Sequence, residues 1–281
     1  MALNKENNGP IFIFLAAFLW SLSGIFTKTF AWDGVSLATL RGVIAFFLAL
    51  LMIRGRRIRP DRVKVLCGIC YFAQGTLFMC ANKFTTAGNA TVLQNTSPLY
   101  IILLNALINR KPPRKDEILV CAVLFLGVGL AFAGNFGGGA AFGNILALLS
   151  ALFYAGVFFL SKQDGADPLE SLVIGNAFYL FLIPFMLSNP VVRNSSLSEW
   201  LFLTAVAAFS GFGAWYCFSI GIRTTTSLQA SFIALAEPVM APLWTFLFLG
   251  EKISPLSLIG FAIVIGTLLV YNLILARRAL Q

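Results

Sequence analysis

The chain has 281 residues, of which 59% are hydrophobic and only 11% are charged, and its mean hydropathy is +0.87. Soluble domains carry roughly 45–50% apolar and about 25% charged residues, so this composition excludes a soluble globular fold and predicts a membrane protein covered by lipid. The net charge of +9 does not indicate a nucleic-acid partner, because the basic residues lie in short segments between apolar runs, where they set membrane topology.

The apolar runs are long enough for ten membrane-spanning helices, since a helix needs about 20 apolar residues, with a range of roughly 17–25, to cross the hydrocarbon core. The predicted spans are Ile11–Phe30, Val35–Ile53, Val63–Phe84, Ala87–Asn109, Ile118–Ala133, Phe142–Ser161, Leu169–Leu187, Leu197–Ile222, Leu228–Leu249 and Leu256–Ala276. The first run is longer than the apolar core of a signal peptide, which is roughly 7–15 residues, so we expect it to be retained. The predicted fold is an all-α integral membrane protein.

The sequence contains an internal repeat, in which matched residues are 134 positions apart at first and 140 positions apart further along. The matched pairs include Trp20 and Tyr154, Lys28 and Lys162, Asp33 and Asp167, Lys83 and Arg223, Thr85 and Thr225, Ala90 and Ala230, and Pro98 and Pro238. The change in separation predicts a six-residue insertion near Asn189–Ser198. We assign the copies to residues 10–135 and 142–277, with the Gly-rich stretch Gly134–Gly139 as the hinge. Five spans per copy would place the copies in opposite orientations, and inverted repeats are typical of alternating-access transporters.

Lysine and arginine are distributed unevenly between the two sides of this predicted bundle. Fifteen of the 20 basic residues fall on the side of the termini, four fall on the other side, and Arg41 lies within a span. Basic loops are retained in the cytoplasm. We therefore expect a multi-pass protein of the cell membrane with both termini cytoplasmic and an external linker at Gly134–Gly143.

The sequence offers little that could support catalysis or bind a metal. It has five cysteines and no histidines, and helix packing explains Cys67 and Cys70, which lie in an apolar run, better than zinc or redox chemistry does. A membrane-embedded lipid enzyme would need a nucleophile, base or metal near the interface, and no such set is present. We expect no catalytic residue, no metal and no cofactor. Without a P-loop, active transport would use an ion or solute gradient.

Two prolines, Pro98 and Pro238, occupy matched positions near the middle of spans four and nine. Proline removes a helical hydrogen bond and clashes with the carbonyl four residues earlier, so the carbonyls of Gln94 and Ala234 are predicted to lose their helical partners. Lipid cannot bond to such groups, and we expect them to face protein or a wet cavity. The alternative is a packing kink, since proline is common in membrane helices.

Two ionisable residues lie within predicted spans. Glu237 is about nine residues, or roughly 14 Å, into span nine, and Arg41 is about six residues, or roughly 9 Å, into span two. A charge at the helix centre costs about 2.5–3.5 kcal/mol on insertion scales, so Glu237 is a candidate for binding a substrate or a proton. Its alternative role is a structural bond to an amide of the broken helix. Arg41 either faces the substrate or snorkels to the outer interface as an anchor.

Amides and aromatic rings near these positions complete the candidate site. Amides bind a ligand without the cost of a buried charge, and aromatic faces attract cations by roughly 0.5–2 kcal/mol. The candidate substrate-binding residues are Trp20, Arg41, Gln74, Gln94, Asn95, Tyr154, Asn176, Trp215 and Glu237. Trp20 and Tyr154 are repeat mates in spans one and six, so we expect their rings to approach each other. Ser21 and Ser23 either line the same cavity or pack helices.

The sequence resembles the EamA group of ten-span carriers in the drug/metabolite transporter superfamily, from about residue 10 to residue 276. The most specific segments are Ala236–Pro242 and Phe248–Ser254, which are similar to the family's ninth span, its turn and the start of the tenth. Arg41 lies in a segment similar to the second span. The first copy departs from the second by having Ser97 where Glu237 stands.

The resemblance implies a central cavity lined by spans one to four and six to nine, and a small-molecule substrate such as an amino acid, a nucleotide sugar or an amine. An acid, a base and amides in one cavity suit a small zwitterion such as an amino acid, and export is the direction that the family favours. The alternatives are an organic-cation or nucleotide-sugar carrier and, in other classes, a lipid enzyme or a channel. We expect the bilayer and a substrate as partners, a proton as candidate coupling ion, and a monomer or homodimer.

Overall fold

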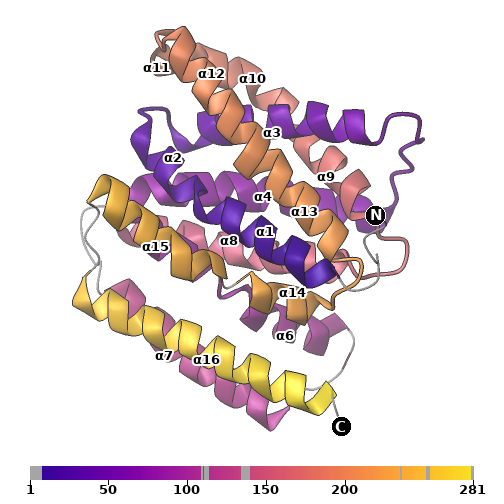
Figure 1. Cartoon of the computed structure of the whole chain (residues 1–281), viewed down its shortest axis with the longest axis vertical. Helices are drawn as coiled ribbons and strands as arrows, with labels where there is room; N and C mark the ends of the chain where they lie inside the picture. The colour runs from indigo at the N-terminus through magenta and orange to yellow at the C-terminus, as the bar shows by residue number, and fades with distance from the viewer. Residues whose placement is uncertain are drawn as a thin grey trace.

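The computed structural model describes residues 8–108, 110, 114–133, 140–234, 236–250 and 254–279, and every regular element in them is a helix (Figure 1). The first half contains α1 (Gly9–Ser21), α2 (Ser23–Thr29), α3 (Gly34–Met52), α4 (Arg62–Phe84), α5 (Ala87–Gln94), α6 (Ser97–Ile108) and α7 (Lys115–Ala133). The second half contains α8 (Ala140–Leu160), α9 (Pro168–Ala177), η1 (Phe178–Leu182), α10 (Ile183–Ser188), α11 (Pro190–Arg193), α12 (Leu197–Val206), η2 (Ala207–Gly213), α13 (Ala214–Gly221), α14 (Ser227–Ile233), α15 (Ala236–Leu249) and α16 (Pro255–Ala279).

The all-α prediction is confirmed, and most predicted spans coincide with long apolar helices. In the described part of the chain, seven helical segments are long and apolar enough to cross a membrane, and they match predicted spans one to four and six to eight. Shorter apolar stretches at Ile118–Gly127 and Pro255–Tyr271 fall in spans five and ten, and span nine is divided between α14 and α15. The total of ten spans and their inversion stay predictions. The hinge Gly134–Gly139 and the family-like segment Glu251–Ile253 lie outside the described residues.

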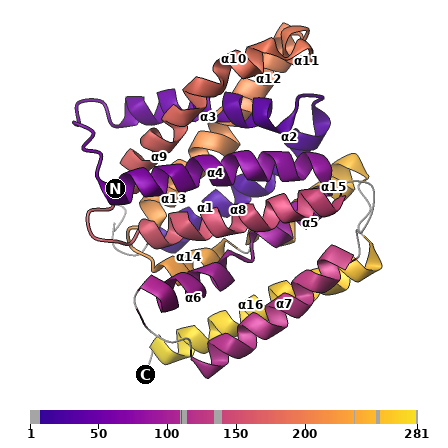
Figure 2. The same ribbon diagram turned by 180° about the vertical axis from the view of Figure 1, so that it is seen from behind.

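The helices form one bundle with a separate pair at its edge. Figure 2 shows α4 lying alongside α8 near the middle, whereas α7 and α16 pack chiefly against each other along one side. Close approach of α4 to α9 requires glycine, because a Cβ on Gly175 would lie 2.4 Å from the carbonyl oxygen of Gly68. In Figure 1 the start of α1 and the end of α16 lie at the same end of the bundle as the α3–α4 loop. We call this the basic end.

Both predicted proline positions are complete helix breaks rather than kinks. α5 ends at Gln94 and α6 starts at Ser97, while α15 starts at Ala236, so Pro98 and Pro238 lie in the first turn of a new helix. Proline is well tolerated there, because its missing N–H would have no helical partner in any case. The carbonyl of Ala234 loses its partner at position 238, as predicted, but it accepts a bond from the Glu237 N–H at 2.9 Å. The Ala234 carbonyl is thus satisfied by the protein, which is one of the two surroundings that we expected for it.

The start of α3 is tied to the segment in which we predicted an insertion. Asp33 is the N-cap of α3, where its carboxylate accepts a bond from the Ser36 N–H at 2.9 Å and from Asn189 Nδ2 at 2.6 Å. Trp32 Nε1 donates to Ser195 Oγ at 2.7 Å. Burial raises the pKa of Asp33, but the bonds from Ser36 and Asn189 outweigh it, so its pKa is lowered overall.

We predict that Asp33→Ala lowers the free energy of unfolding by about 1–2 kcal/mol, the usual cost of losing an N-cap. The lowered pKa means that the contribution is present above the unfolded carboxyl's pKa of about 3.9 and disappears as the pH falls through the native pKa. Thermal unfolding of the detergent-purified protein at pH 7 and pH 3 measures both effects. Equal unfolding temperatures for Asp33→Ala and wild type at pH 7 would contradict this.

Candidate functional site

The two helix breaks meet inside the bundle. Asn95 lies at the break between α5 and α6, and Glu237 lies in the first turn of α15, which packs against α5. Asn95 Nδ2 is 3.5 Å from Glu237 Oε2 and also donates to the Thr91 carbonyl at 3.0 Å. Both side chains are buried, at 1% and 2% exposed. The positive end of the α15 helix dipole favours a carboxylate at this position.

Two roles were predicted for Glu237, binding a substrate or proton and forming a structural bond to an amide of the broken helix, and its contacts bear on this choice. Among the described residues its carboxylate has a side-chain amide as its hydrogen-bond partner rather than a backbone amide of the broken helix. At 3.5 Å that bond is long for a hydrogen bond to a carboxylate, which is usually about 2.7–2.9 Å. The carboxylate therefore keeps most of its capacity to bind another group.

Glu237 and Arg41 line the same pocket. Its lining includes the candidates Trp20, Arg41, Gln74, Gln94, Tyr154, Trp215 and Glu237, together with Ser23 and Phe78. Arg41 also lines two adjoining pockets, one of which includes Asn176. Eight of the nine candidates thus line these pockets, and Asn95 contacts Glu237 behind one of them.

Arg41 points into the bundle rather than to an interface. Its Nη2 donates to the Ser210 carbonyl at 3.1 Å, within the π-helix η2. A Cβ on Gly211 would lie 2.7 Å from Arg41 Cγ, so the arginine side chain needs glycine at this position. Because the Arg41 guanidinium group is bound within the bundle, the predicted alternative that it snorkels to the outer interface is wrong. In the part of the chain that the structure describes, no ion pair joins Arg41 to Glu237, although both face one pocket.

Aromatic rings form the third component of the site. The rings of Trp20 and Tyr154 lie edge to face with centroids 5.7 Å apart, which confirms their predicted approach. Trp215 packs on Trp20 at 4.6 Å and on Tyr71 at 4.5 Å. Trp20 Nε1 and Tyr154 Oη are buried and have no hydrogen-bond partner among the described residues. An unpaired buried polar group costs about 1–3 kcal/mol, and a ligand in the pocket could satisfy both atoms.

Some candidate residues already have structural partners. Gln94 Nε2 donates to Ser150 Oγ at 2.6 Å, and Asn176 Nδ2 donates to the Leu172 carbonyl at 2.9 Å. The sequence prediction missed Tyr71 and Tyr179, which line the pocket with Asn176. Nothing in the sequence separates these two tyrosines from other aromatic residues of the spans. No group of three His, Cys, Asp or Glu side chains that could hold a metal occurs in the described ranges.

Repeat mates make similar contacts at opposite ends of the bundle. Lys28 Nζ donates to the Thr85 carbonyl at 2.7 Å, and its mate Lys162 donates to the Ile222 carbonyl at 3.1 Å. Each lysine lies at the end of the first predicted span of its half or just after it, and its partner carbonyl lies at the end of the third span or just after it. We call these contacts the Lys28 latch and the Lys162 latch.

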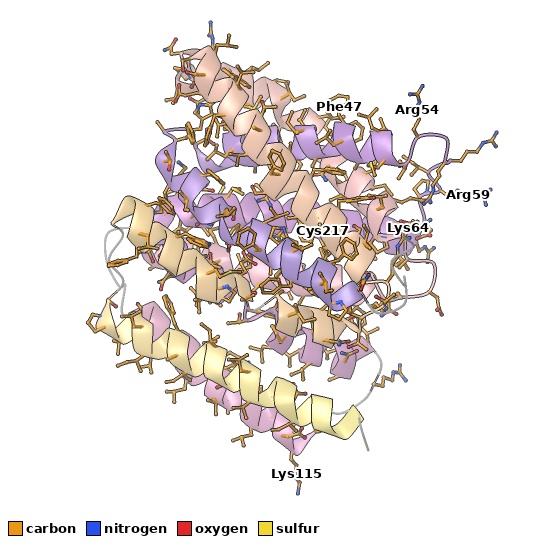
Figure 3. The ribbon with its side chains drawn as sticks, in the orientation of Figure 1. Phe47, Arg54, Arg59, Lys64, Lys115 and Cys217 are labelled. Atoms are coloured by element: carbon orange, nitrogen blue, oxygen red, sulfur yellow. The ribbon has the colours of Figure 1, made fainter. Side chains whose placement is uncertain are left out.

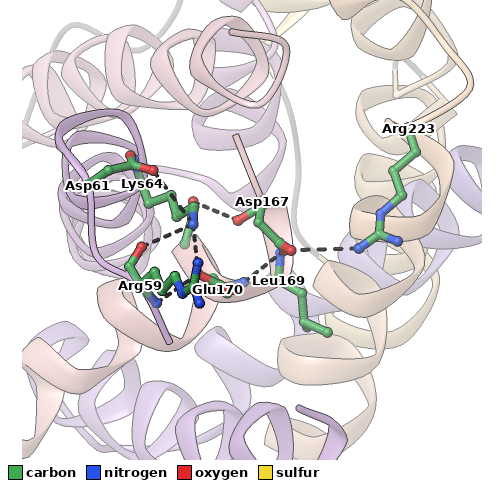
Figure 4. A network of polar contacts seen from close by, with 8 residues as sticks. Arg59, Asp61, Lys64, Asp167, Leu169, Glu170 and Arg223 are labelled. Carbon is green, nitrogen blue, oxygen red and sulfur yellow. Dashed lines mark hydrogen bonds and ion pairs between the residues drawn. The ribbon is translucent and has the colours of Figure 1, made fainter. Parts of the chain in front are cut away.

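The Lys162 latch lies at the basic end beside a network of ion pairs. Figure 4 shows Lys64 between Asp61 and Glu170, at 3.5 and 2.9 Å, and Arg223 opposite Asp167, at 3.9 Å. This network joins the starts of α4 and α9 to the loop after α13. Polar contacts therefore connect α4, α9 and the loop after α13 at the basic end.

Comparisons with a family model and with individual relatives indicate a transporter, and a comparison with solved structures indicates a shared fold. A model of the EamA-like transporter family matches residues 7–133 and again residues 141–273. A protein of Archaeoglobus fulgidus named as an uncharacterized transporter is 27% identical over 270 residues, which are 93% of this chain and 95% of that protein. The pseudopaline exporter CntI of Pseudomonas aeruginosa is 21% identical over 94% of this chain and 96% of its own. A crystal structure with 21% identity matches 98% of this chain and 99% of that one with a TM-score of 0.69, which shows similarity of fold.

We predict that Tyr154→Phe leaves the thermal stability unchanged or slightly raised, because the hydroxyl that it removes is buried without a partner. Tyr154→Ala should instead destabilise by about 3–5 kcal/mol, the usual cost of emptying an aromatic position in a core. Thermal unfolding of both variants in detergent makes the comparison. A loss of stability in Tyr154→Phe would mean that the hydroxyl has a structural partner.

Proposed function

Because the chain belongs to the EamA-like transporter family, we propose that it carries a small zwitterion such as an amino acid across the cell membrane by alternating access. The chain is a multi-pass membrane transporter and not an enzyme. The observation that supports the zwitterion most strongly is that Glu237 and Arg41 line one pocket without pairing with each other.

The chemistry of the pocket fits both ends of such a substrate. Glu237 would accept hydrogen bonds from an ammonium group, and Arg41 would donate to a carboxylate. Each charge within the bundle is costly when it is alone, and a zwitterion compensates both at once. The faces of Trp20 and Trp215 would add attraction for the ammonium group or for an apolar side chain.

We further propose ten spans in two inverted copies, residues 10–135 and 142–277, with both termini cytoplasmic. The two family matches and the repeat-related latches at opposite ends support this arrangement. In alternating access one end opens while the other stays closed. The basic end, which would be cytoplasmic, carries the Lys162 latch, and the opposite end carries the Lys28 latch.

Export driven by a proton gradient is the direction and coupling that we favour. Similarity to a named exporter supports the direction. Glu237 supports the coupling, because a buried carboxylate that meets substrate can also take up a proton. An organic cation is the second candidate substrate, because aromatic rings and an acid surround the pocket. Arg41 in the same pocket counts against it.

We predict that Glu237→Gln keeps the fold but lowers substrate uptake by about 10- to 100-fold, because a hydrogen bond to a charged group is worth about 1.5–3 kcal/mol. Glu237→Asp should retain part of the activity. Uptake into proteoliposomes, measured with and without a pH gradient, tests both variants. A matched control is Ser97→Ala, which alters the repeat mate of Glu237 and should leave the pH dependence unchanged. Wild-type uptake by Glu237→Gln with the same pH dependence would make Glu237 structural.

We predict that Lys28→Met and Lys162→Met have opposite effects on access to the pocket from the side opposite the basic end, because each substitution removes the latch at one end only. The reporter is Ser23→Cys in a cysteine-free background, since Ser23 lines the pocket that contains Glu237 and Arg41. Lys28→Met should speed labelling of this cysteine by a membrane-impermeant maleimide added on the side opposite the basic end. Lys162→Met should slow it. Equal rates in both variants would show that the latches do not control access.

A further inference from the structure

An unpaired cluster of arginines projects from the basic end. We call it the basic rim, and it consists of Arg54, Arg56, Arg57, Arg59 and Arg62, which lie in the α3–α4 loop and at the start of α4 and are all exposed. Figure 3 shows the side chains of Arg54 and Arg59 extending away from the helices. These five charges serve neither the pocket nor the latches.

The end of the loop that leads into α4 is bonded to neighbouring elements, although the arginine side chains extend outward. The Arg59 carbonyl accepts a bond from Lys64 Nζ at 3.0 Å, and the Arg59 N–H donates to Glu170 Oε2 at 3.3 Å (Figure 4). The Asp61 side chain caps α4 by accepting from the Lys64 N–H at 2.9 Å. This end of the loop is therefore held against α9, which fixes the backbone near Arg59 and Arg62.

Three acidic residues near the rim already have ion-pair partners outside it. Asp61 and Glu170 both pair with Lys64, and Asp167 pairs with Arg223. No ion pair to any arginine of the rim occurs among the residues that the structure describes. The rim thus presents five exposed guanidinium groups that form no ion pair within the described part of the chain.

Exposed apolar side chains lie directly beside the rim. Leu51 and Met52, at the end of α3, are 62% and 50% exposed, and Leu66, one turn into α4, is 52% exposed. In a membrane protein such surfaces meet acyl chains. Arg54 and Arg62 are within about one helical turn of these side chains along the chain, which is the spacing expected between acyl chains and lipid phosphates.

We propose that the basic rim binds the phosphate groups of anionic phospholipids in the adjoining leaflet. Guanidinium groups bind phosphate in a bidentate manner and favour it over the other anions of a membrane surface. The adjacent apolar surface favours a lipid over a soluble anion, which would gain nothing from Leu51 or Leu66. The opposite end offers a natural contrast, because Arg193 is an isolated exposed cation there. This proposal is independent of the transported substrate.

The test measures thermal stabilisation of the full-length detergent-purified protein by phosphatidylglycerol and by phosphatidylcholine. Wild type should be stabilised by phosphatidylglycerol more than by phosphatidylcholine, and the difference should shrink as salt is raised. Replacing Arg54, Arg56 and Arg57 together by Gln should weaken the apparent affinity for phosphatidylglycerol by at least about tenfold, since each basic residue near a membrane surface contributes to such binding. The matched variant with three Lys residues should keep part of it, because Lys supplies the charge but not the bidentate geometry, and Arg193→Gln should change nothing.

Several results would overturn the proposal. One is equal stabilisation of wild type by the two lipids at low salt, which does not depend on any variant folding correctly. Another is unchanged phosphatidylglycerol affinity in the Gln variant. A third is stabilisation by inorganic phosphate or glycerol phosphate equal to that by the lipid, which would make the rim a site for soluble anions.

Discussion

The interior of this protein depends on two interrupted helices that meet in mid-bundle. Pro98 and Pro238 prevent a continuous helix in two of the predicted spans, and the interruptions bring Asn95 and the start of α15 into contact. A continuous helix would satisfy its backbone internally and present only side chains to the pocket. An interruption adds a helix N-terminus, and the one at α15 suits the carboxylate of Glu237. The position of the acid, and with it the character of the pocket, follows from these breaks.

A second feature of the interior is that the acid and the base of the pocket, Glu237 and Arg41, are kept apart. Arg41 is held on α3 by the Ser210 carbonyl and by the space above Gly211, while Glu237 is held on α15 by its place beside the break. Each side chain is thus positioned by its own helix rather than by the other. A paired acid and base would neutralise each other and offer little to a ligand. The unpaired arrangement keeps both available, at a cost that the bound substrate offsets.

Apolar run length predicted much of the fold, because it reports on single helices, and it located the long helices to within a few residues. The internal repeat predicted one contact between helices, that of Trp20 with Tyr154. Features that depend on the packing of particular neighbours, with no repeat to mark them, could not be predicted. The π-helix η2, which holds Arg41, leaves no local pattern, and Tyr71 differs from other aromatic residues only in what packs on it. Proline predicted a disturbance in each span, but whether the helix bends or stops depends on the neighbours that replace the lost bonds.

The central claim is that one pocket recognises an ammonium group and a carboxylate together. The most direct test is thermal stabilisation of the purified wild-type protein by matched sets of metabolites, since a ligand that binds the native state raises its apparent stability. Each set would hold an amino acid, the amine that lacks its carboxylate and the acid that lacks its amino group. The account predicts that at least one intact zwitterion raises the unfolding temperature and that neither of its single-charge analogues does so to the same extent. Equal or greater stabilisation by the amines alone, with no response to any zwitterion, would contradict it.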